Sequence, residues 1–156
     1  MFKNMLLLLC LAALVFPAEK YTGPIPPKPD VPYLLHASNL IETETGQARQ
    51  DNRKNDVAFV ISGTSSPART PLAEPIFLLQ SRDISPDRLE LYRADIKGGN
   101  REVSLGSGKR RNRALHLMVT PLTGHLYRIE ADEVLENGEY VLTPNGDNRV
   151  FCFSVY

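Results

Sequence analysis

The sequence predicts an all-β protein, a single antiparallel β-sandwich of immunoglobulin type with about nine strands. Short apolar or alternating runs are separated by turn residues at intervals of roughly 8–12 residues, and no stretch has a sustained helical period. Valine, leucine, tyrosine and phenylalanine are plentiful, whereas tryptophan is absent. A tyrosine-bearing turn near the C-terminus also favours the sandwich, and a small barrel is the alternative architecture.

Residues 1–18 have the three parts of a secretory signal peptide. Lys3 supplies a positive start, Met5–Phe16 is an unbroken apolar run, and Pro17-Ala18 leads into polar sequence. The apolar run is shorter than the roughly 20 residues that a membrane-spanning helix needs. We therefore expect export to the periplasm or the extracellular space, with no transmembrane segment after cleavage. An uncleaved N-terminal anchor is the alternative.

The charge balance argues against a nucleic-acid partner. The chain has 18 basic and 18 acidic residues, and removal of residues 1–18 takes away Lys3 and Cys10. The mature chain then has a net charge of about −1, which gives no basic field for nucleic acid. Cys152 becomes its lone thiol, so no internal disulfide is expected and stability must come from a packed core.

Residues 19–32 are predicted to form a proline-rich extended arm ahead of a β-sandwich domain at residues 33–156. Five prolines lie within Tyr21–Pro32 and bias it to polyproline-like geometry. The arm is expected to act as a spacer or to cover a sheet edge. Recognition by a proline-binding module and donation of the arm to a neighbouring subunit are the alternatives.

The first half of the domain alternates between strands and polar connections. Val57–Ser62 has apolar residues on both faces and is predicted to be a central strand. Gly46–Asp56 is highly polar and is predicted to be a solvated hairpin tip, while Gly63–Pro75 is predicted to be a long loop that crosses between sheets. The other strands expected in this half are Tyr33–Ala37, Leu40–Thr45 and Ile76–Gln80.

The second half contains clearer hairpin signals. Gly98-Gly99-Asn100 marks a tight turn between two strands, because glycine adopts positive φ at little cost. Pro144-Asn145-Gly146-Asp147 marks another turn before the last strand. The strands expected here are Leu89–Lys97, Arg101–Leu105, Ala114–Thr120, Leu126–Ala131, Glu139–Thr143 and Val150–Tyr156.

Leu135, Gly138 and Tyr140 have the spacing of a tyrosine corner. In this motif a leucine points into the core, a glycine makes the turn, and the tyrosine hydroxyl bonds to a backbone group a few residues upstream. The spacing resembles the corner of bacterial immunoglobulin-like domains, although these usually have proline where this chain has Asn137. The motif predicts a structural role and says little of function.

Three stretches together resemble a family of short exported bacterial proteins with an immunoglobulin-like β-sandwich and no assigned activity. They are Pro26–His36, Arg69–Pro75 and Glu136–Tyr140. The resemblance covers most of the mature chain. It implies export and bacterial origin, and it brings no catalytic residues.

No catalytic, metal or cofactor site is predicted. His36, His116 and His125 have no metal-ligand spacing, and the serine-bearing Gly63-Thr64-Ser65-Ser66 lacks a nucleophile elbow. A hydrolase site assembled in space from a histidine and a carboxylate such as Asp132 is the enzymatic alternative. The carboxylates before the corner alternate with apolar residues, which is typical of a solvent-facing strand edge; they are Glu130, Asp132, Glu133 and Glu136.

Cys152 lies between Phe151 and Phe153 and is predicted to be a buried, inert thiol. A nucleophile paired with a histidine and, if the thiol is exposed, an intermolecular disulfide are the alternatives.

The densest run of positive charge is the candidate binding site, formed by Lys109, Arg110, Arg111 and Arg113 in a glycine-bearing loop. In an exported protein its partners would be an anionic glycan, a lipid headgroup or an acidic protein. A solvated loop with structural charge pairing is the simpler interpretation. The sequence thus favours an exported, non-enzymatic module with a binding or assembly role, using this loop together with Gly63–Pro75 if both lie at one end.

Overall fold

The computed structural model describes residues 20–54, 56–107, 109 and 111–156. The predicted signal peptide, residues 1–18, therefore lies outside the described residues, as does Glu19, the first residue of the arm. The described part contains fifteen strands: β1 (Tyr33–His36), β2 (Asn39–Glu42), β3 (Glu44–Gln47), β4 (Arg49–Arg53), β5 (Asp56–Ser62), β6 (Arg69–Thr70), β7 (Ile76–Gln80), β8 (Leu89–Arg93), β9 (Asp95–Lys97), β10 (Asn100–Ser104), β11 (Ala114–Leu115), β12 (Leu117–Thr123), β13 (Leu126–Ala131), β14 (Gly138–Pro144) and β15 (Arg149–Val155).

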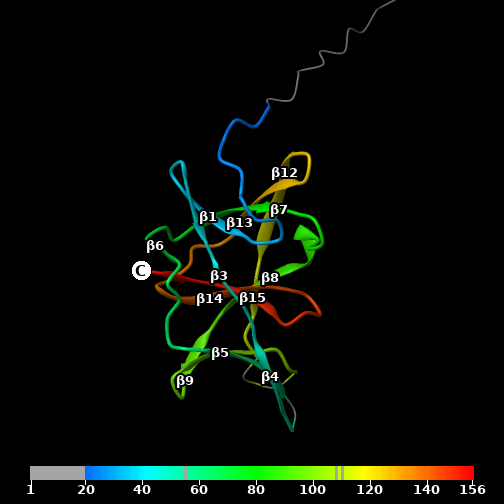
Figure 1. Cartoon of the computed structure of the whole chain (residues 1–156). Coiled ribbons are helices and arrows are strands. Elements are labelled where there is room, and N and C mark those ends of the chain that lie inside the picture. Colours follow the sequence, from blue (N-terminus) through cyan, green and yellow to red (C-terminus); the bar gives the residue numbers. More distant parts are fainter. Residues whose placement is uncertain (1–19, 55, 108, 110) are drawn as a thin grey trace, which may run out of the picture.

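The strands form three sheets that lie one above another (Figure 1). The first outer sheet has the order β12-β13-β7-β1-β2, and the second outer sheet has the order β4-β5-β10-β9. Between them, the central sheet has the order β11-β8-β14-β15-β3. All strand pairs are antiparallel except β6 with β15. The predicted all-β, antiparallel class is therefore confirmed.

Two hydrophobic cores fill the spaces between the three sheets. The first contains Phe77 and Ile129 of the first outer sheet packed against Phe153 of the central sheet. The second contains Phe59 of the second outer sheet, packed with Val141 and other residues of the central sheet. Strands β14 and β15 are buried along nearly their whole length because both faces of the central sheet are covered.

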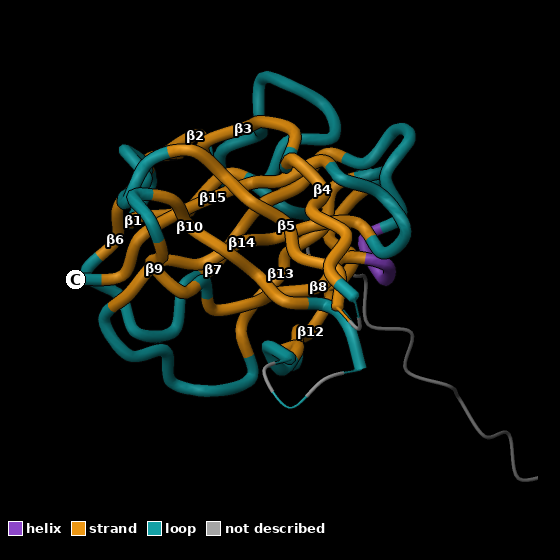
Figure 2. The backbone as a smooth tube through the Cα atoms, turned by 90° about the horizontal axis from the view of Figure 1, so that it is seen from below, coloured by secondary structure: helices purple, strands orange, loops and turns teal. Residues whose placement is uncertain are grey.

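One extended run, Asn39–Arg53, connects all three layers (Figures 1 and 2). Its strands β2, β3 and β4 belong to three different sheets and are separated only by the buried residues Thr43 and Ala48. The Thr43 hydroxyl donates to the carbonyl of Pro32 at 2.7 Å, and the Ala48 N–H donates to the carbonyl of Asn148 at 2.8 Å. These bonds hold the chain where it passes from one sheet to the next.

This run corrects the expectation of a solvated hairpin tip at Gly46–Asp56. Residues Arg49–Arg53 form β4, which pairs with β5 along its whole length. The strand lies at the edge of its sheet, and its side chains are mostly exposed. Charged side chains are common on edge strands because they discourage pairing with other chains, so polarity alone did not distinguish this strand from a loop.

The arrangement also differs from the expected two sheets with about nine strands. The expected strand Leu89–Lys97 is divided into β8 and β9, which lie in different sheets on either side of Ala94. Apolar periodicity predicts which positions are buried, but it does not reveal when a strand leaves one sheet for the next. For this reason the sequence pattern did not predict a third layer.

The end of the proline-rich arm is attached to its own domain. The Asp30 carboxylate accepts hydrogen bonds of 2.8–3.0 Å from the N–H groups of Arg82, Asp83 and Ile84, and Lys28 pairs with Glu42 at 2.8 Å. Burial acts to raise the pKa of Asp30, but the three N–H groups outweigh it and hold this pKa below its ordinary value. The arm from Lys28 onward is thus fixed against the domain.

Tyr140 forms the hydrogen bond of a tyrosine corner. Its hydroxyl donates to the carbonyl of Glu136 at 2.7 Å, and its ring stacks on Phe153 with centroids 5.5 Å apart. Leu135 is buried in the first core, and a Cβ added to Gly138 would lie 3.2 Å from Arg93 Nε. All three residues therefore occupy structural positions.

Among the described residues the helical content is a single 3-10 turn, Pro86–Arg88, and none of it is long and apolar enough to cross a membrane.

Candidate functional site

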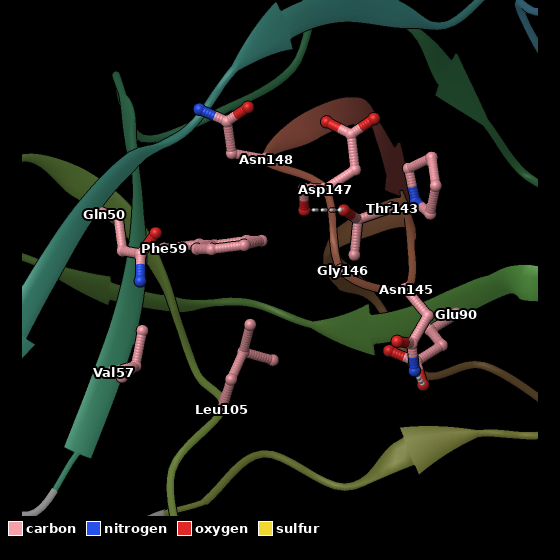
Figure 3. Close-up of a pocket in the computed structure, with 11 residues that line it drawn as sticks. Gln50, Val57, Phe59, Glu90, Leu105, Thr143, Asn145, Gly146, Asp147 and Asn148 are labelled. Atoms are coloured by element: carbon pink, nitrogen blue, oxygen red, sulfur yellow. Dashed lines mark hydrogen bonds between the residues drawn. The ribbon is translucent and has the colours of Figure 1, made fainter.

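A groove of about 490 Å³ lies between β4 and β5 on one side and the β14–β15 turn on the other (Figure 3). Its apolar part is formed by Val57 and Phe59 of β5 with Leu105, which follows β10. The Phe59 ring points across the groove toward the turn. Phe59 is 8% exposed, because most of its side chain packs in the second core.

The polar groups of the groove are carboxamide and carboxylate side chains from three segments. Gln50 lies on β4, Glu90 lies on β8, and Asn145, Asp147 and Asn148 belong to the turn. Strand β4 pairs with β5, and Gln50 lies opposite Phe59 in the register, so the two side chains project from the same face of the sheet. These segments are far apart in the sequence, and the antiparallel pairing brings them together.

The β14–β15 turn is held in one conformation by its neighbours. The Asn145 N–H donates to the carbonyl of Arg88 at 2.8 Å, and Arg88 Nη2 donates back to the carbonyl of Asn145 at 2.9 Å. Gly146 has φ of +80°, a left-handed conformation that favours glycine. The Thr143 hydroxyl donates to the carbonyl of Arg149 at 2.8 Å. These bonds hold the backbone of the turn in place.

Both carboxylates in the groove already have partners. Glu90 accepts hydrogen bonds of 2.8 Å from the Tyr92 hydroxyl and from Asn145 Nδ2. Asp147 accepts bonds from the N–H of Arg149 at 2.9 Å and from Arg149 Nε at 2.7 Å. The backbone bond, followed by the side-chain bond, lowers the pKa of Asp147. Asp147 is thus paired with a cation, whereas the partners of Glu90 among the described residues are neutral donors.

The predicted basic site follows a groove residue in the chain and is only partly free. Leu105 lines the groove, and the loop that follows carries Lys109, Arg111 and Arg113, all of them exposed. Arg113 forms an ion pair with Glu133 at 2.8 Å, and this bond lowers the pKa of Glu133. The fourth predicted residue, Arg110, lies outside the described residues.

The basic loop and the Gly63–Pro75 loop lie at opposite ends of β5 (Figure 1). Gly63 follows the last residue of β5, whereas the N–H of Leu105 donates to the carbonyl of Val57 at the start of this strand, at 2.7 Å. Seven residues of strand span about 23 Å. The two loops therefore do not form the common face that the sequence suggested.

The Gly63–Pro75 loop instead covers a buried polar cluster. Arg101 is 1% exposed and donates to both oxygens of Glu44, at 2.6 and 2.9 Å, and to the carbonyls of Ser62 and Gly63. Nearby, Glu139 accepts hydrogen bonds from the N–H of Ser66 at 2.8 Å and from the Ser154 hydroxyl. These contacts satisfy buried groups and fasten the loop to the sheets. Their role is structural.

The histidines give one pair with a carboxylate. His116 Nδ1 lies 3.0 Å from Asp132 Oδ2, and the His116 side chain is 73% exposed. His116 also lines a hollow of about 440 Å³ together with Asp87 and Glu90. Across the described ranges, no group of three or more His, Cys, Asp or Glu side chains is placed to hold a metal ion.

Cys152 is buried at the interface of the central sheet with the second outer sheet. Burial raises the pKa of its thiol to about 12. The thiolate, which is the reactive form, is therefore scarce at neutral pH. The thiol of Cys152 is therefore buried, as the sequence predicted.

Sequence reasoning identified the turn at Pro144–Asp147 but missed the groove beside it. Gln50 was expected in a hairpin tip, and the partners of the turn come from residues 50, 59 and 90, with no local signal that links them. Comparisons with protein-family models, with curated proteins and with solved structures found no match to this chain.

Proposed function

We propose that the protein is an exported, non-enzymatic β-sandwich module with a binding role in the cell envelope or outside the cell. The observation that carries the binding role is the groove beside the β14–β15 turn, which is preformed on two packed sheets. Ligand sites are commonly concave and largely preformed in this way. Export is supported by the pattern of residues 1–18.

The finer description as an immunoglobulin-like domain of a bacterial family also belongs to this proposal. It is supported by the hydrogen bond from Tyr140 to the Glu136 carbonyl and by the three stretches that resemble the family.

Lys109 and Arg111 are the basic residues that we expect to add to binding. Both are exposed in the loop that follows Leu105, and Arg113 contributes less because it is paired with Glu133. Their preferred partner would be an anionic glycan, a lipid headgroup or an acidic protein. Binding residues are often found on loops held by a rigid scaffold, as here.

Export and binding can be tested on the full chain. Expressed in a bacterial host, it should be recovered from the periplasm or the medium with a mature N-terminus near Glu19, measured by mass spectrometry. Recovery only from the cytoplasm with residues 1–18 intact would contradict export.

Binding would be tested by applying the mature protein to glycan and lipid arrays and to envelope extracts. Ligands of the basic loop should be lost in a Lys109→Ala/Arg111→Ala variant and kept in Arg82→Ala/Lys97→Ala. The second variant makes the same charge change at exposed residues distant in sequence. Equal binding by both variants would exclude the basic loop, and absence of any ligand in all three formats would contradict the binding role.

The His116–Asp132 pair favours one second candidate, a hydrolase with a dispersed site. A carboxylate that orients a histidine is a recurring feature of general-base catalysis, and this pair lies at the rim of a hollow. Hydrolysis of ester, glycoside or peptide substrates that is abolished in His116→Ala would support this function. Activity that persists in that variant would exclude His116.

Donation of the arm to a neighbouring subunit remains a third proposal, now restricted to residues before Pro26. Pro26 is buried, and Lys28 and Asp30 are bonded within their own domain. Unchanged sedimentation after deletion of Tyr21–Ile25 would argue against donation.

A further inference from the structure

We propose that the groove beside the β14–β15 turn binds an uncharged sugar ring of a glycan. This inference rests on the proposed binding function and names the ligand class for the groove, as distinct from the basic loop. Its basis is the combination of an apolar wall, carboxamide side chains, hydrogen-bonded acids and an ordered turn within one hollow.

The apolar wall suits the C–H face of a sugar ring. Val57, Phe59 and Leu105 come together on one side, and the Phe59 ring points into the groove (Figure 3). A sugar ring has a face of C–H groups that can pack on such a surface, as apolar groups do generally. A volume of about 490 Å³ lies within the range of small-ligand sites.

The polar groups around this wall suit hydroxyl groups, which both donate and accept hydrogen bonds. Gln50, Asn145 and Asn148 each present a carboxamide with the same dual character. Their NH₂ groups have partners within the protein at 3.3 Å for Gln50 and Asn148 and at 2.8 Å for Asn145. The two 3.3 Å bonds are long, so these groups can turn to a ligand at little cost.

The charges of the groove favour a neutral ligand. No lysine or arginine is among the described residues that line it, so an anion would find no direct partner there. Asp147 is paired with Arg149, and both oxygens of Glu90 already accept hydrogen bonds from the neutral groups of Tyr92 and Asn145, so a cation would have to compete with bonds already formed. Carboxylate oxygens held in this way can still accept a hydrogen bond from a ligand hydroxyl group.

The rigidity of the turn supports selective binding. Arg88 and Asn145 are joined by two backbone-directed hydrogen bonds, and the Ala48 N–H donates to the carbonyl of Asn148 at 2.8 Å. Polar groups that are already positioned lose less conformational freedom when a ligand binds.

The test uses the mature full-length protein on an array of neutral and acidic oligosaccharides, followed by calorimetric titration with the neutral oligosaccharides that bind. We expect binding of neutral oligosaccharides. Gln50→Ala should weaken it about fivefold, the effect of one hydrogen bond. Phe59→Leu, which keeps the core apolar, should also weaken it. Gln47→Ala is the matched control. It removes an exposed glutamine from β3, the strand that precedes β4 in the chain, and Gln47 does not line the groove. Thermal unfolding establishes that each variant is folded.

Binding only of acidic oligosaccharides, lost in Lys109→Ala/Arg111→Ala and kept in Gln50→Ala, would overturn this inference and leave the binding function standing. Equal binding of neutral oligosaccharides by the parent, Gln50→Ala and Phe59→Leu would also overturn it. The absence of any bound oligosaccharide would overturn it as well. If lipids or envelope proteins were then found to bind, the broader proposal of a binding function would still stand.

Discussion

Breaking the buried Arg101–Glu44 pair should cost more stability than removing it entirely. Arg101 is 1% exposed and makes four hydrogen bonds, two of them to Glu44. In Glu44→Ala the guanidinium stays buried with only the carbonyls of Ser62 and Gly63 as partners. Loss of one member of a buried pair costs roughly 3–5 kcal/mol. Because the Glu44 side chain is 30% exposed and water can take its place, we expect about 3 kcal/mol.

The double variant Glu44→Ala/Arg101→Met removes the charge together with its partner. The apolar methionine side chain can pack against the second core, where Val103 and Cys152 lie. Replacement of a buried pair by apolar groups is often nearly neutral, so this variant should be more stable than Glu44→Ala alone.

Urea unfolding at pH 7, with the free energy of unfolding taken from the midpoint and slope, measures both effects. Exposed Arg53–Asp51 provides a control, because Asp51→Ala should cost under about 1 kcal/mol. A double variant less stable than Glu44→Ala, or a cost of Glu44→Ala as small as that of Asp51→Ala, would refute the reasoning.

Three further predictions concern other parts of the fold. Tyr140→Phe should lose about 1 kcal/mol, the scale of one buried hydrogen bond, and about 4 °C in Tm, whereas Tyr127→Phe should not; equal Tm values for the two variants would count against the corner. Stability should fall in acid, because the folded-state pKa values of Asp30 and Glu44 lie below the ordinary values. Each group's contribution is present above the unfolded pKa of about 4 and is lost as pH falls through the folded pKa. Urea midpoints that decline as steeply in Asp30→Asn as in the parent would exclude a role for Asp30. Finally, Cys152 should resist a thiol reagent at pH 8 in the folded protein and react fully in denaturant, since its pKa is raised to about 12; rapid reaction of the native protein would contradict its burial.

The sequence predicted the fold class because strand and turn signals are local. The Gly98-Gly99 turn and the Pro144–Asp147 turn occur where expected, with positive φ at Gly98, Gly99 and Gly146. The Tyr140 spacing likewise predicted a hydrogen bond that lies within one turn of the chain.

The three-layer arrangement and the polar contacts between layers could not be predicted in this way. Strands β2, β3 and β4 form one extended run in the sequence, and nothing at Thr43 or Ala48 marks the change of sheet. Glu44 and Arg101 are 57 positions apart, and nothing in the sequence around either residue distinguishes it from an ordinary surface charge. Their pairing depends on the distant register of β10 with β5 and of β3 with β15.

The candidate site illustrates the same division. The exposed charges of Lys109 and Arg111 were evident from composition, whereas the groove depends on Phe59, Gln50 and Asn148 meeting through strand pairing. A hollow between sheets has no sequence pattern of its own.

The most direct test of the binding groove is a titration of the isotope-labelled mature protein with the neutral oligosaccharides, followed by amide NMR. The account predicts chemical-shift changes that saturate and concentrate at Gln50, Phe59 and Asn145–Asn148. Shifts confined to the loop containing Lys109 and Arg111, or no shifts at any residue, would contradict it.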